Sequence, residues 1–300
     1  MHRFLSSRGT FVAVLIVAGT ALLTPASLKA VVVEHWDFED GVDGTPFTNT
    51  DGNTLGNEGS GGSTGVNGTL MRGWDEYWGP DWSSAAASPE GGLLGMTVKD
   101  GHEDGYTIDG ALHNWTSSDW TLEVHVKFDS FDGWETIVGR DGSSFSVAES
   151  DFYFQRKGMD NNELRLNYRT SGGTQYVVDG VTTLQEGHWY GLAAVADSTA
   201  GTITLLIDDG NGYVQDGQLT GLAEDLGVYS SAINWTFGRG WYNGGFGDRL
   251  DGYLDNVRIS DTALAPSELL PVGVVPEPST VVLAGLAIAI AARAMTTRRR

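Results

Sequence analysis

The 300-residue chain has 39 acidic and 18 basic residues, a formal net charge of −21, and no cysteine. Such an acidic surface repels nucleic acids and anionic lipids, and the lack of cysteine excludes disulfides, zinc–thiolate sites and a cysteine nucleophile. Ten Trp, ten Tyr and eleven Phe need a hydrophobic core to bury them, which argues against a disordered chain.

The N-terminus has the three-part layout of a secretory signal peptide. Basic residues precede an apolar run over residues 10–23, and small residues follow it up to Ala30. We expect residues 1–30 to be the signal peptide, with cleavage after Ala30; cleavage after Ala26 also fits. The alternative is a membrane anchor, but the run is shorter than the roughly 20 apolar residues that span a bilayer.

Between the two ends, short runs of alternating apolar and polar residues predict β-strands. In the clearest one, Trp120 to Phe128, the apolar residues face one way and Glu123, His125 and Lys127 face the other, as in a strand with one solvated face. Clusters of Gly, Asp and Asn separate the runs and predict turns. We expect further strands at 31–38, 93–98, 135–138, 151–156, 163–169, 174–178, 188–196, 202–207, 233–238 and 252–259.

Many short strands with this spacing predict an all-β, antiparallel two-sheet sandwich. No internal repeat is evident, so we expect one domain over residues 31–270. Residues 49–69 are rich in Gly, Asn, Thr and Ser and predict a long surface loop. The only helix that the sequence predicts is a turn or two around Pro266 to Leu270.

The C-terminus combines three features in order. Pro276, Glu277 and Pro278 form a stiff extended segment, the apolar run after them is marginal as a spanning helix, and the closing arginines would stay on the cytoplasmic side. An ordinary membrane anchor explains the run and the arginines but not the Pro-Glu-Pro, so we expect a transient membrane stop that is removed by proteolysis. This tail, 271–300, consists of the motif at 275–280, the apolar helix at 281–292 and the basic end at 293–300.

This tail resembles the PEP-CTERM sorting signal of Gram-negative bacteria, which a membrane protease called exosortase is thought to process. The resemblance implies an exosortase-type protease as a partner, transient anchoring by the C-terminal helix, and export to the cell surface or extracellular matrix, often in bacteria that make extracellular polysaccharide. Without residues 1–30 and 281–300, 11 basic residues face all 39 acids, so the formal charge becomes −28.

Several blocks of the central region resemble the laminin G-like, concanavalin A-like jelly-roll domains of bacterial surface proteins. The resemblance spans most of residues 31–270 and implies a two-sheet jelly roll. The blocks occur in the order of that family: Trp36 to Gly41, the strand 120–128 followed by Ile137 to Arg140, Gly187 to Tyr190, the strand and turn 202–209, Phe237 to Arg239, and Leu250 to Ile259.

Asp255 is the candidate metal ligand. By the alternation of its strand it shares an apolar face with Val257 and Ile259, where a carboxylate is costly unless it is paired or bound to a metal. In related folds an acid at this position holds a structural calcium, so the resemblance implies Ca²⁺ at Asp255 with Asp37 and Glu39 as partners. The alternative is that Asp255 accepts backbone hydrogen bonds or pairs with an arginine.

Two groups of aromatic residues are candidates for ligand binding. Flat aromatic faces beside acids and amides stack on sugar rings while the polar groups bond the hydroxyls. The alternative is that these rings close the rims of the sandwich core. The candidates are Trp74, Tyr77 and Trp78, close to Trp82, and Trp241 with Tyr242 in a Gly-rich loop.

No catalytic residue is predicted. Jelly rolls of this type include glycoside hydrolases that use a Glu-x-Asp-x-x-Glu motif, sometimes with one extra residue before the last Glu, and place the two catalytic carboxylates about 5 Å apart. The nearest segment here has Glu149 and Asp151, but Phe154 or Gln155 stands where the second catalytic acid should be.

Polysaccharide lyases of similar fold use a Tyr with a His or Gln, plus Arg. Residues of these kinds are present as His188 with Tyr190 and as Arg165 with Tyr168 and Arg169, but no family motif joins them.

The sequence therefore favours an exported, non-catalytic surface or matrix protein whose jelly roll binds a glycan or a surface partner, with a structural calcium. Two alternatives stay open: a secreted polysaccharide hydrolase or lyase, and a purely structural matrix component.

Overall fold

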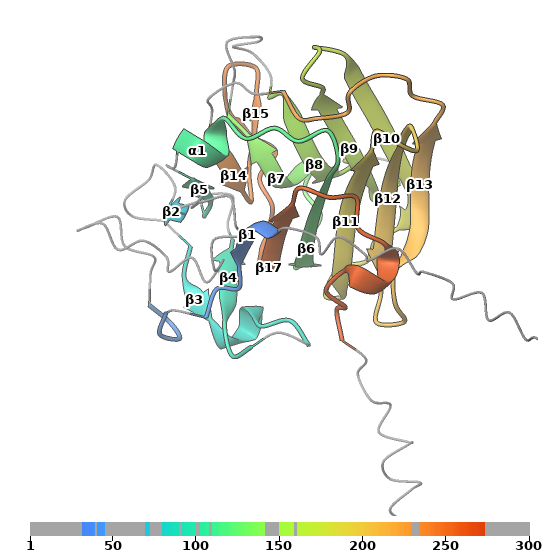
Figure 1. Cartoon of the computed structure of the whole chain (residues 1–300). Coiled ribbons are helices and arrows are strands. Elements are labelled where there is room, and N and C mark those ends of the chain that lie inside the picture. The colour runs from blue at the N-terminus through green and yellow to red at the C-terminus, as the bar shows by residue number, and fades with distance from the viewer. Residues whose placement is uncertain are drawn as a thin grey trace, which may run out of the picture.

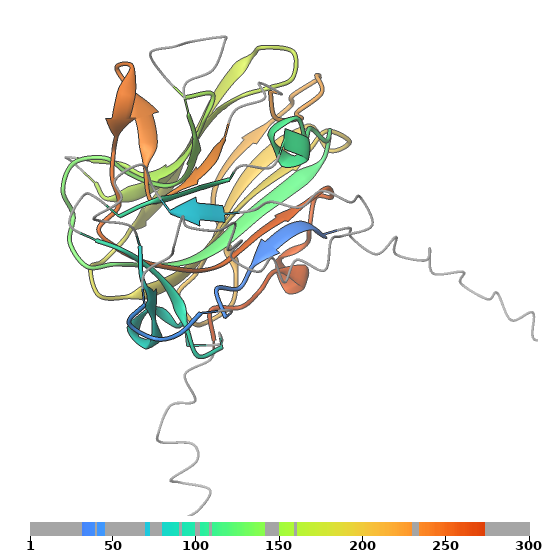
Figure 2. The ribbon, with the colours of Figure 1, turned by 90° about the vertical axis from the view of Figure 1, so that its left-hand side faces the viewer.

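The computed structural model describes residues 32–39, 41–45, 70–72, 80–89, 92–99, 103–107, 110–141, 150–158, 161–229 and 234–273. Within these residues the strands form two antiparallel sheets stacked as layers, with a small two-stranded hairpin rising beside them (Figure 1 and Figure 2). This architecture confirms the predicted all-β jelly-roll sandwich. No helix in the described ranges is both long and apolar enough to cross a membrane.

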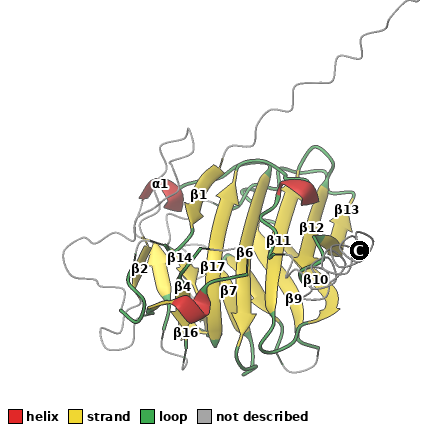
Figure 3. Ribbon diagram, turned by 90° about the horizontal axis from the view of Figure 1, so that it is seen from below, coloured by secondary structure: helices red, strands yellow, loops and turns green. Residues whose placement is uncertain are grey.

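Figure 3 looks onto the larger sheet, in which β17 and β6 are central and β13 forms one edge. Its strands follow the order β13–β12–β11–β6–β17–β4–β3, and β1 pairs with β17. Their bounds are β1 (Val32–Trp36), β3 (Trp82–Ser83), β4 (Gly95–Val98), β6 (Trp120–Phe128), β11 (Trp189–Asp197), β12 (Thr202–Asp208), β13 (Val214–Thr220) and β17 (Gly252–Ser260).

The smaller sheet follows the order β10–β9–β8–β7–β14–β5–β2. Its strands are β2 (Leu70–Arg72), β5 (Gly105–Thr107), β7 (Glu135–Arg140), β8 (Phe152–Arg156), β9 (Glu163–Arg169), β10 (Gln175–Thr183) and β14 (Trp235–Phe237), and the hairpin pairs β15 (Gly240–Tyr242) with β16 (Gly245–Gly247).

Three short helices lie among the described residues. The 3-10 helix η3 (Pro266–Glu268) falls within the segment where the sequence predicts a helix. The sequence does not predict α1 (Gly110–His113) or the 3-10 helix η2 (Ser84–Ala86), because a single turn leaves no periodic pattern to read.

Aromatic side chains fill the space between the sheets. Trp120 of β6 is 1% exposed, and its ring packs edge-on against Phe152 of β8 and Tyr168 of β9 at centroid distances of 5.9 and 5.3 Å. Its indole nitrogen donates to the carbonyl of Leu226 at 2.9 Å, so its one polar group is satisfied. These contacts join the two sheets directly and fix β8 and β9, the strands that carry the candidate site.

Residues 261–272, the C-terminal strap, cross the outer face of the larger sheet (Figure 1). The backbone nitrogen of Leu270 donates to Glu123 at 2.7 Å, and the Leu270 carbonyl lies 3.0 Å from His125 Nε2. Glu123 and His125 are therefore buried, at 1% and 2% exposure, and the prediction of a solvated face on Trp120–Phe128 is wrong for these two residues. The alternation is present, but the strap covers its polar side.

A β-bulge in β17 changes which of its residues face the core. The pairing with β6 shifts between Asp255 and Arg258, and Asn256 has a φ of +50°, in the left-handed region that Asn tolerates. Val257 therefore joins Leu254 in the core cluster, whereas Asp255 lies opposite His125 on the outer side. The predicted sharing of a face between Asp255 and Val257 is wrong, because simple alternation does not anticipate the extra residue.

Candidate functional site

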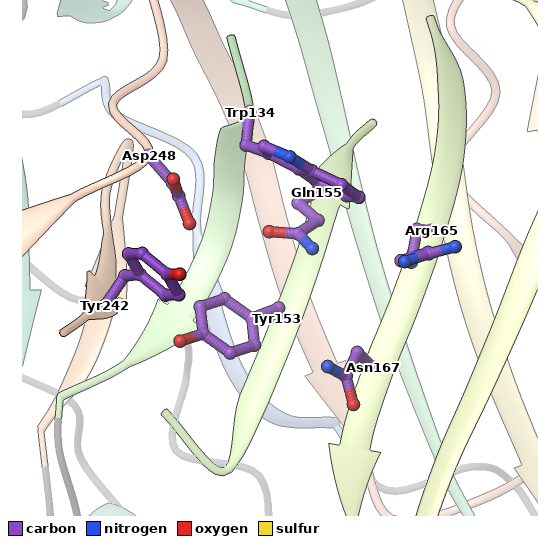
Figure 4. Close-up of a pocket in the computed structure, with 7 residues that line it drawn as sticks. All are labelled: Trp134, Tyr153, Gln155, Arg165, Asn167, Tyr242 and Asp248. Carbon is purple, nitrogen blue, oxygen red and sulfur yellow. The ribbon is translucent and has the colours of Figure 1, made fainter. Parts of the chain in front are cut away.

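A groove of about 370 Å³ lies on the outer face of the smaller sheet. Strands β8 and β9 form its floor, and the β15–β16 hairpin with the residue that follows it and the segment before β7 form its walls (Figure 4). Its lining residues are Trp134, Tyr153, Gln155, Arg165, Asn167, Tyr242 and Asp248.

The alternation of β8 and β9 produces this floor. Phe152 and Phe154 of β8 are buried in the core, so Tyr153 and Gln155 face outward. In β9 every second residue is buried, and Asn167 lies between two of them in sequence and opposite Tyr153 in the pairing. Two neighbouring strands therefore present their polar residues side by side.

Three aromatic rings border the groove. Tyr242 is 59% exposed at the end of β15. Tyr153 is held in place because its hydroxyl donates to the Trp241 carbonyl and accepts from Ser150 N at 2.9 Å. Trp134 forms the opposite wall, with the Arg165 guanidinium 5.2 Å from its ring centre. The rings of Trp134 and Tyr242 flank a space between them (Figure 4).

Amide groups supply hydrogen-bonding capacity on the floor. The Gln155 carbonyl accepts from Thr136 Oγ1 at 3.4 Å, and the Asn167 carbonyl accepts from the Gln175 amide at 2.8 Å. Each of these amides keeps an NH₂ group for another partner.

The two charged residues of the groove differ in their pairing. Arg165 donates through Nε and Nη2 to the two Asp179 oxygens at 2.5 and 2.8 Å, and this hydrogen bonding raises the pKa of Arg165 and lowers that of Asp179. Asp248 has no hydrogen bond or ion pair to its carboxylate from any residue that the structure describes, and burial raises its pKa. Figure 4 shows this carboxylate directed into the groove. The one unpaired charge lining the groove is thus negative.

A second hollow of about 630 Å³ adjoins the groove and shares Trp134 and Asp248 with it. Asp132, Glu135 and Asp251 also line it. Together the two hollows form a continuous depression with an aromatic wall and several acids.

A buried ion pair holds the segment that carries Trp134. Arg156 of β8 and Glu135 of β7 are 1% and 0% exposed, with Nε 2.6 Å from Oε2. The Arg156 guanidinium also donates to the carbonyl of Gly133 at 2.7 Å and to Asn162 Oδ1 at 2.7 Å. Because Gly133 precedes Trp134, this network fixes one wall of the groove.

The aromatic residues that the sequence singles out for ligand binding lie in different places. Tyr242 lines the groove, whereas Trp241 packs edge-on against Phe246, 5.4 Å between centroids, and does not line it. Trp82 is 6% exposed and belongs to the core. Three further candidates lie outside the described residues, namely Trp74, Tyr77 and Trp78.

The groove residues that the sequence does not predict have a common signal. Four of them lie on the outward side of β8 and β9, where polar and aromatic residues alternate with buried apolar ones. That pattern marks a solvated sheet face but does not show that the face is hollowed or that Trp134 and Asp248 close it.

The candidate calcium ligands lie near one another but are engaged with the backbone. Asp255 Oδ2 accepts from Ser88 N at 2.8 Å, Glu39 accepts from the nitrogens of Leu93 and Leu94, and Asp37 Oδ1 accepts from Glu39 N at 3.2 Å. In the described parts of the chain no three acidic or histidine side chains gather as a metal cluster.

Asp255 nevertheless has one oxygen to offer a cation. Its Oδ1 is buried without a hydrogen-bond partner among the described residues. Burial raises the pKa of Asp255 to about 7, and the negative charge of Glu39 adds to this rise. A carboxylate in this setting is stabilised by a proton or by a bound cation.

Of the two residues that could stand at the position of the second hydrolase acid, Phe154 and Gln155, only Gln155 lines the groove. Phe154 is buried in the core, so Gln155 is the residue that faces the groove. Asp151 is 3% exposed with its Oδ1 3.6 Å from Arg169 Nε, and Glu149 lies outside the described residues. Among the residues that the structure describes, Asp248 is the single carboxylate that lines the groove itself.

The lyase-type residues do not form one site. His188 and Tyr190 stack edge-on at 4.7 Å and line a separate hollow, whereas Arg165 lines the groove. Tyr168 is buried in the core, with its hydroxyl donating to the Leu226 carbonyl at 3.0 Å.

Comparison with protein families gives two matches. Residues 100–270 match the laminin G family model described as the concanavalin A-like lectin/glucanases superfamily, and residues 274–300 match the PEP-CTERM protein-sorting motif. The second match covers Pro276, Glu277 and Pro278, which lie outside the residues that the structure describes. No curated protein matches the chain in sequence.

Several solved structures resemble the chain. A carbohydrate-binding module, CBM40, of the Ruminococcus gnavus IT-sialidase bound to α2,3-sialyllactose is 15% identical, with a TM-score of 0.41 over 50% of this chain and 80% of that one. A mutant of the NanB sialidase from Streptococcus pneumoniae is 17% identical, with a TM-score of 0.46 over 58% of this chain and 26% of that one. A pentraxin from Limulus polyphemus is 15% identical, with a TM-score of 0.39 over 50% and 67%. With identities and TM-scores this low, what these three proteins bind carries no argument about the ligand of this chain.

Proposed function

Because this chain belongs to the concanavalin A-like lectin/glucanases superfamily and is an exported, cell-surface-associated protein with a PEP-CTERM sorting motif, we propose that it is a non-catalytic surface or matrix protein that binds a glycan. The groove on the smaller sheet is the binding site.

The observation that carries this proposal is the combination of aromatic faces and amides in the groove. Trp134 and Tyr242 offer flat apolar surfaces on which sugar rings stack, the buried Tyr153 forms the floor between them, and Gln155 and Asn167 offer donors for sugar hydroxyls. The groove is open, which suits an extended polymer rather than a small cofactor enclosed in a cavity.

Affinity electrophoresis of the exported protein through gels that contain polysaccharides tests the proposal. We expect retardation by at least one polymer, and a loss of affinity of about fivefold or more in Tyr242→Ala, because stacking on a ring contributes on the order of 1 kcal/mol. A matched control is Val177→Ala, which trims an exposed apolar side chain of β10 in the same sheet that lines neither of the two hollows. Absence of binding to every polymer, or equal loss in both variants, contradicts the proposal and favours a purely structural role.

A polysaccharide hydrolase or lyase is the second candidate function. In the described part of the chain the groove has one carboxylate, Asp248, whereas hydrolysis of a glycoside uses a pair. We expect no reducing ends and no unsaturated product from a polysaccharide panel. Release of either product, abolished by Asp248→Asn or by Tyr153→Phe, would establish an enzyme instead.

A structural calcium ion at Asp255 is the next part of the proposal. The buried, unpartnered Oδ1 supports it, with Glu39 and Asp37 as the nearest predicted partners. We expect Ca²⁺ to raise the melting temperature of EDTA-treated protein, and Asp255→Asn to abolish that rise. Asp209→Asn, a change at an exposed acid of the β12–β13 turn, should retain it. An equal melting temperature with Ca²⁺ and with EDTA would exclude the site.

Processing at both ends completes the proposal. Residues 1–30 act as a signal peptide, and an exosortase-type protease of a Gram-negative bacterium removes the tail after the C-terminal helix has anchored the chain transiently. Intact-mass measurement of protein released from the native host tests this, since a mature chain should begin near Val31 and end close to Pro276. A mass that includes residues 281–300 would contradict removal of the tail.

A further inference from the structure

We propose that the groove selects polysaccharides that carry free amino groups, with an ammonium group bound at Asp248. This inference rests on the proposed glycan-binding function and specifies its ligand class. It follows from the charges and rings of the depression formed by the two adjoining hollows.

The depression has an excess of unpaired negative charge. Its two cationic lining residues are both bound to acids: Arg165 to Asp179, and Arg249 through Nη1 to Asp104 at 2.7 Å. Its lining acids include three that have no cationic partner among the described residues. These three are Asp132, Asp248 and Asp251.

The position of Asp248 suits an ammonium ligand. Its carboxylate faces the groove beside Tyr242, Tyr153 and Gln155 (Figure 4). An ammonium group there would donate to the carboxylate and lie against the π-faces of Tyr242 or Trp134, and both interactions favour a cation. The carboxylate accepts no hydrogen bond within the described structure, so a ligand donor would not have to displace one.

The backbone keeps this carboxylate in place. Asp248 has a φ of +48°, in the left-handed region that few residue types adopt, and its carbonyl accepts from Thr136 N at 2.7 Å. The residue is therefore held at a bend between β16 and β17 by a backbone hydrogen bond to the start of β7.

An anionic polysaccharide does not fit the same depression. Among the described residues, Arg165 is the guanidinium that lines the aromatic groove, and its charge is already paired with Asp179, so a uronate or another acid would meet Asp248 and Asp251 without an unpaired cation. A neutral polysaccharide would stack on the rings but leave Asp248 without a charged partner. Amino sugars combine the stacking surface with the missing cation.

Three oligosaccharides that differ in one substituent test this inference on the exported protein by isothermal titration at low ionic strength and mildly acidic pH. They are beta-linked hexasaccharides of glucosamine, N-acetylglucosamine and glucose, which carry an ammonium, an acetamido and a hydroxyl group at the same carbon. We expect the glucosamine hexasaccharide to bind about tenfold more tightly than the other two, which is the effect of one charge-assisted hydrogen bond. Added salt should weaken that ligand alone.

Asp248→Asn is the decisive variant, because Asn adopts a positive φ readily and retains the size of the side chain. We expect it to remove the tenfold advantage of the amine and to leave binding of the glucose hexasaccharide within about twofold. Asp209→Asn is the control and should change neither. An advantage for the acetylated sugar, or an amine advantage that survives in Asp248→Asn, would overturn the inference.

The outcomes separate this inference from the proposed function. If the glucose hexasaccharide binds in a Tyr242-dependent manner and the amine is no better, glycan binding stands and amine selection is wrong. If no oligosaccharide binds, the proposed function itself fails. A polylysine peptide is tested in the same way. If it binds as tightly as the glucosamine hexasaccharide, the site recognises positive charge on a peptide, and the assignment to a polysaccharide is wrong.

Discussion

Replacing Arg156 with methionine should be among the most destabilising single changes in the domain. Glu135 and Arg156 are almost fully buried, so the variant leaves a carboxylate without its cation, a loss that costs about 3–5 kcal/mol. The carbonyl of Gly133 and the side chain of Asn162 also lose their donors. Since an entire domain is stable by only about 5–15 kcal/mol, the variant should forfeit a large share of the free energy of unfolding.

Urea unfolding followed by tryptophan fluorescence measures this loss. The control is Arg165→Met, which breaks an ion pair on the neighbouring strand that is partly exposed, and should cost under about 1 kcal/mol. The double variant with Glu135→Gln should recover more than half of the loss, because no buried charge remains. If Arg156→Met costs no more than Arg165→Met, the assignment of this pair as the support of the Trp134 segment is wrong.

Three further predictions concern other parts of the domain. Asp208→Ala removes the acceptor of three backbone nitrogens, including that of Val272. It should lower the free energy of unfolding, measured in urea, by about 3 kcal/mol and make the C-terminal strap accessible to proteases. Unchanged protease resistance would contradict this. Binding of the glucosamine hexasaccharide should weaken as pH falls, because burial raises the pKa of Asp248 and its carboxylate is neutralised on acidification; titrations at several pH values check this, and Asp248→Asn should flatten the profile. Gly252→Ala should cost over about 2 kcal/mol, since its Cβ would lie 2.0 Å from the Lys127 carbonyl; a wild-type melting temperature would refute the clash.

The sequence predicts the central strands well because they alternate against a core. The strands 120–128 and 163–169 are observed at the predicted bounds, and those at 188–196 and 252–259 are shifted or extended by one residue. Strand β13 is not predicted, because an edge strand with mostly exposed side chains shows little apolar alternation. The sequence also does not predict that the C-terminal strap covers the outer face of the larger sheet. The strap has only one turn of helix, so no repeating apolar pattern indicates the surface on which it packs.

The candidate site is predicted only in part. Tyr242 is identified because aromatic residues in a Gly-rich loop are conspicuous in a sequence. Trp134 and Asp248 are not, because they are more than a hundred residues apart in the chain and come together only in the fold, where Thr136 N donates to the Asp248 carbonyl. The bulge at Asn256 adds one residue to the strand, so Asp255 and Val257 lie on opposite faces of the sheet. Strict alternation in the sequence predicts the same face for both.

The C-terminal strap also determines how the domain responds to mechanical load. A pull applied through the chain beyond Val272 first reaches the bond to Asp208, then the bond from Leu270, and then the bond from Leu264. These bonds are loaded one after another, as in peeling, rather than together as between two sheared strands. We therefore expect the strap to yield before either sheet, which would uncover Leu264 and Leu269 while the sandwich stays intact. A domain held by its C-terminus would then extend under tension at a release point outside its core, without unfolding the groove.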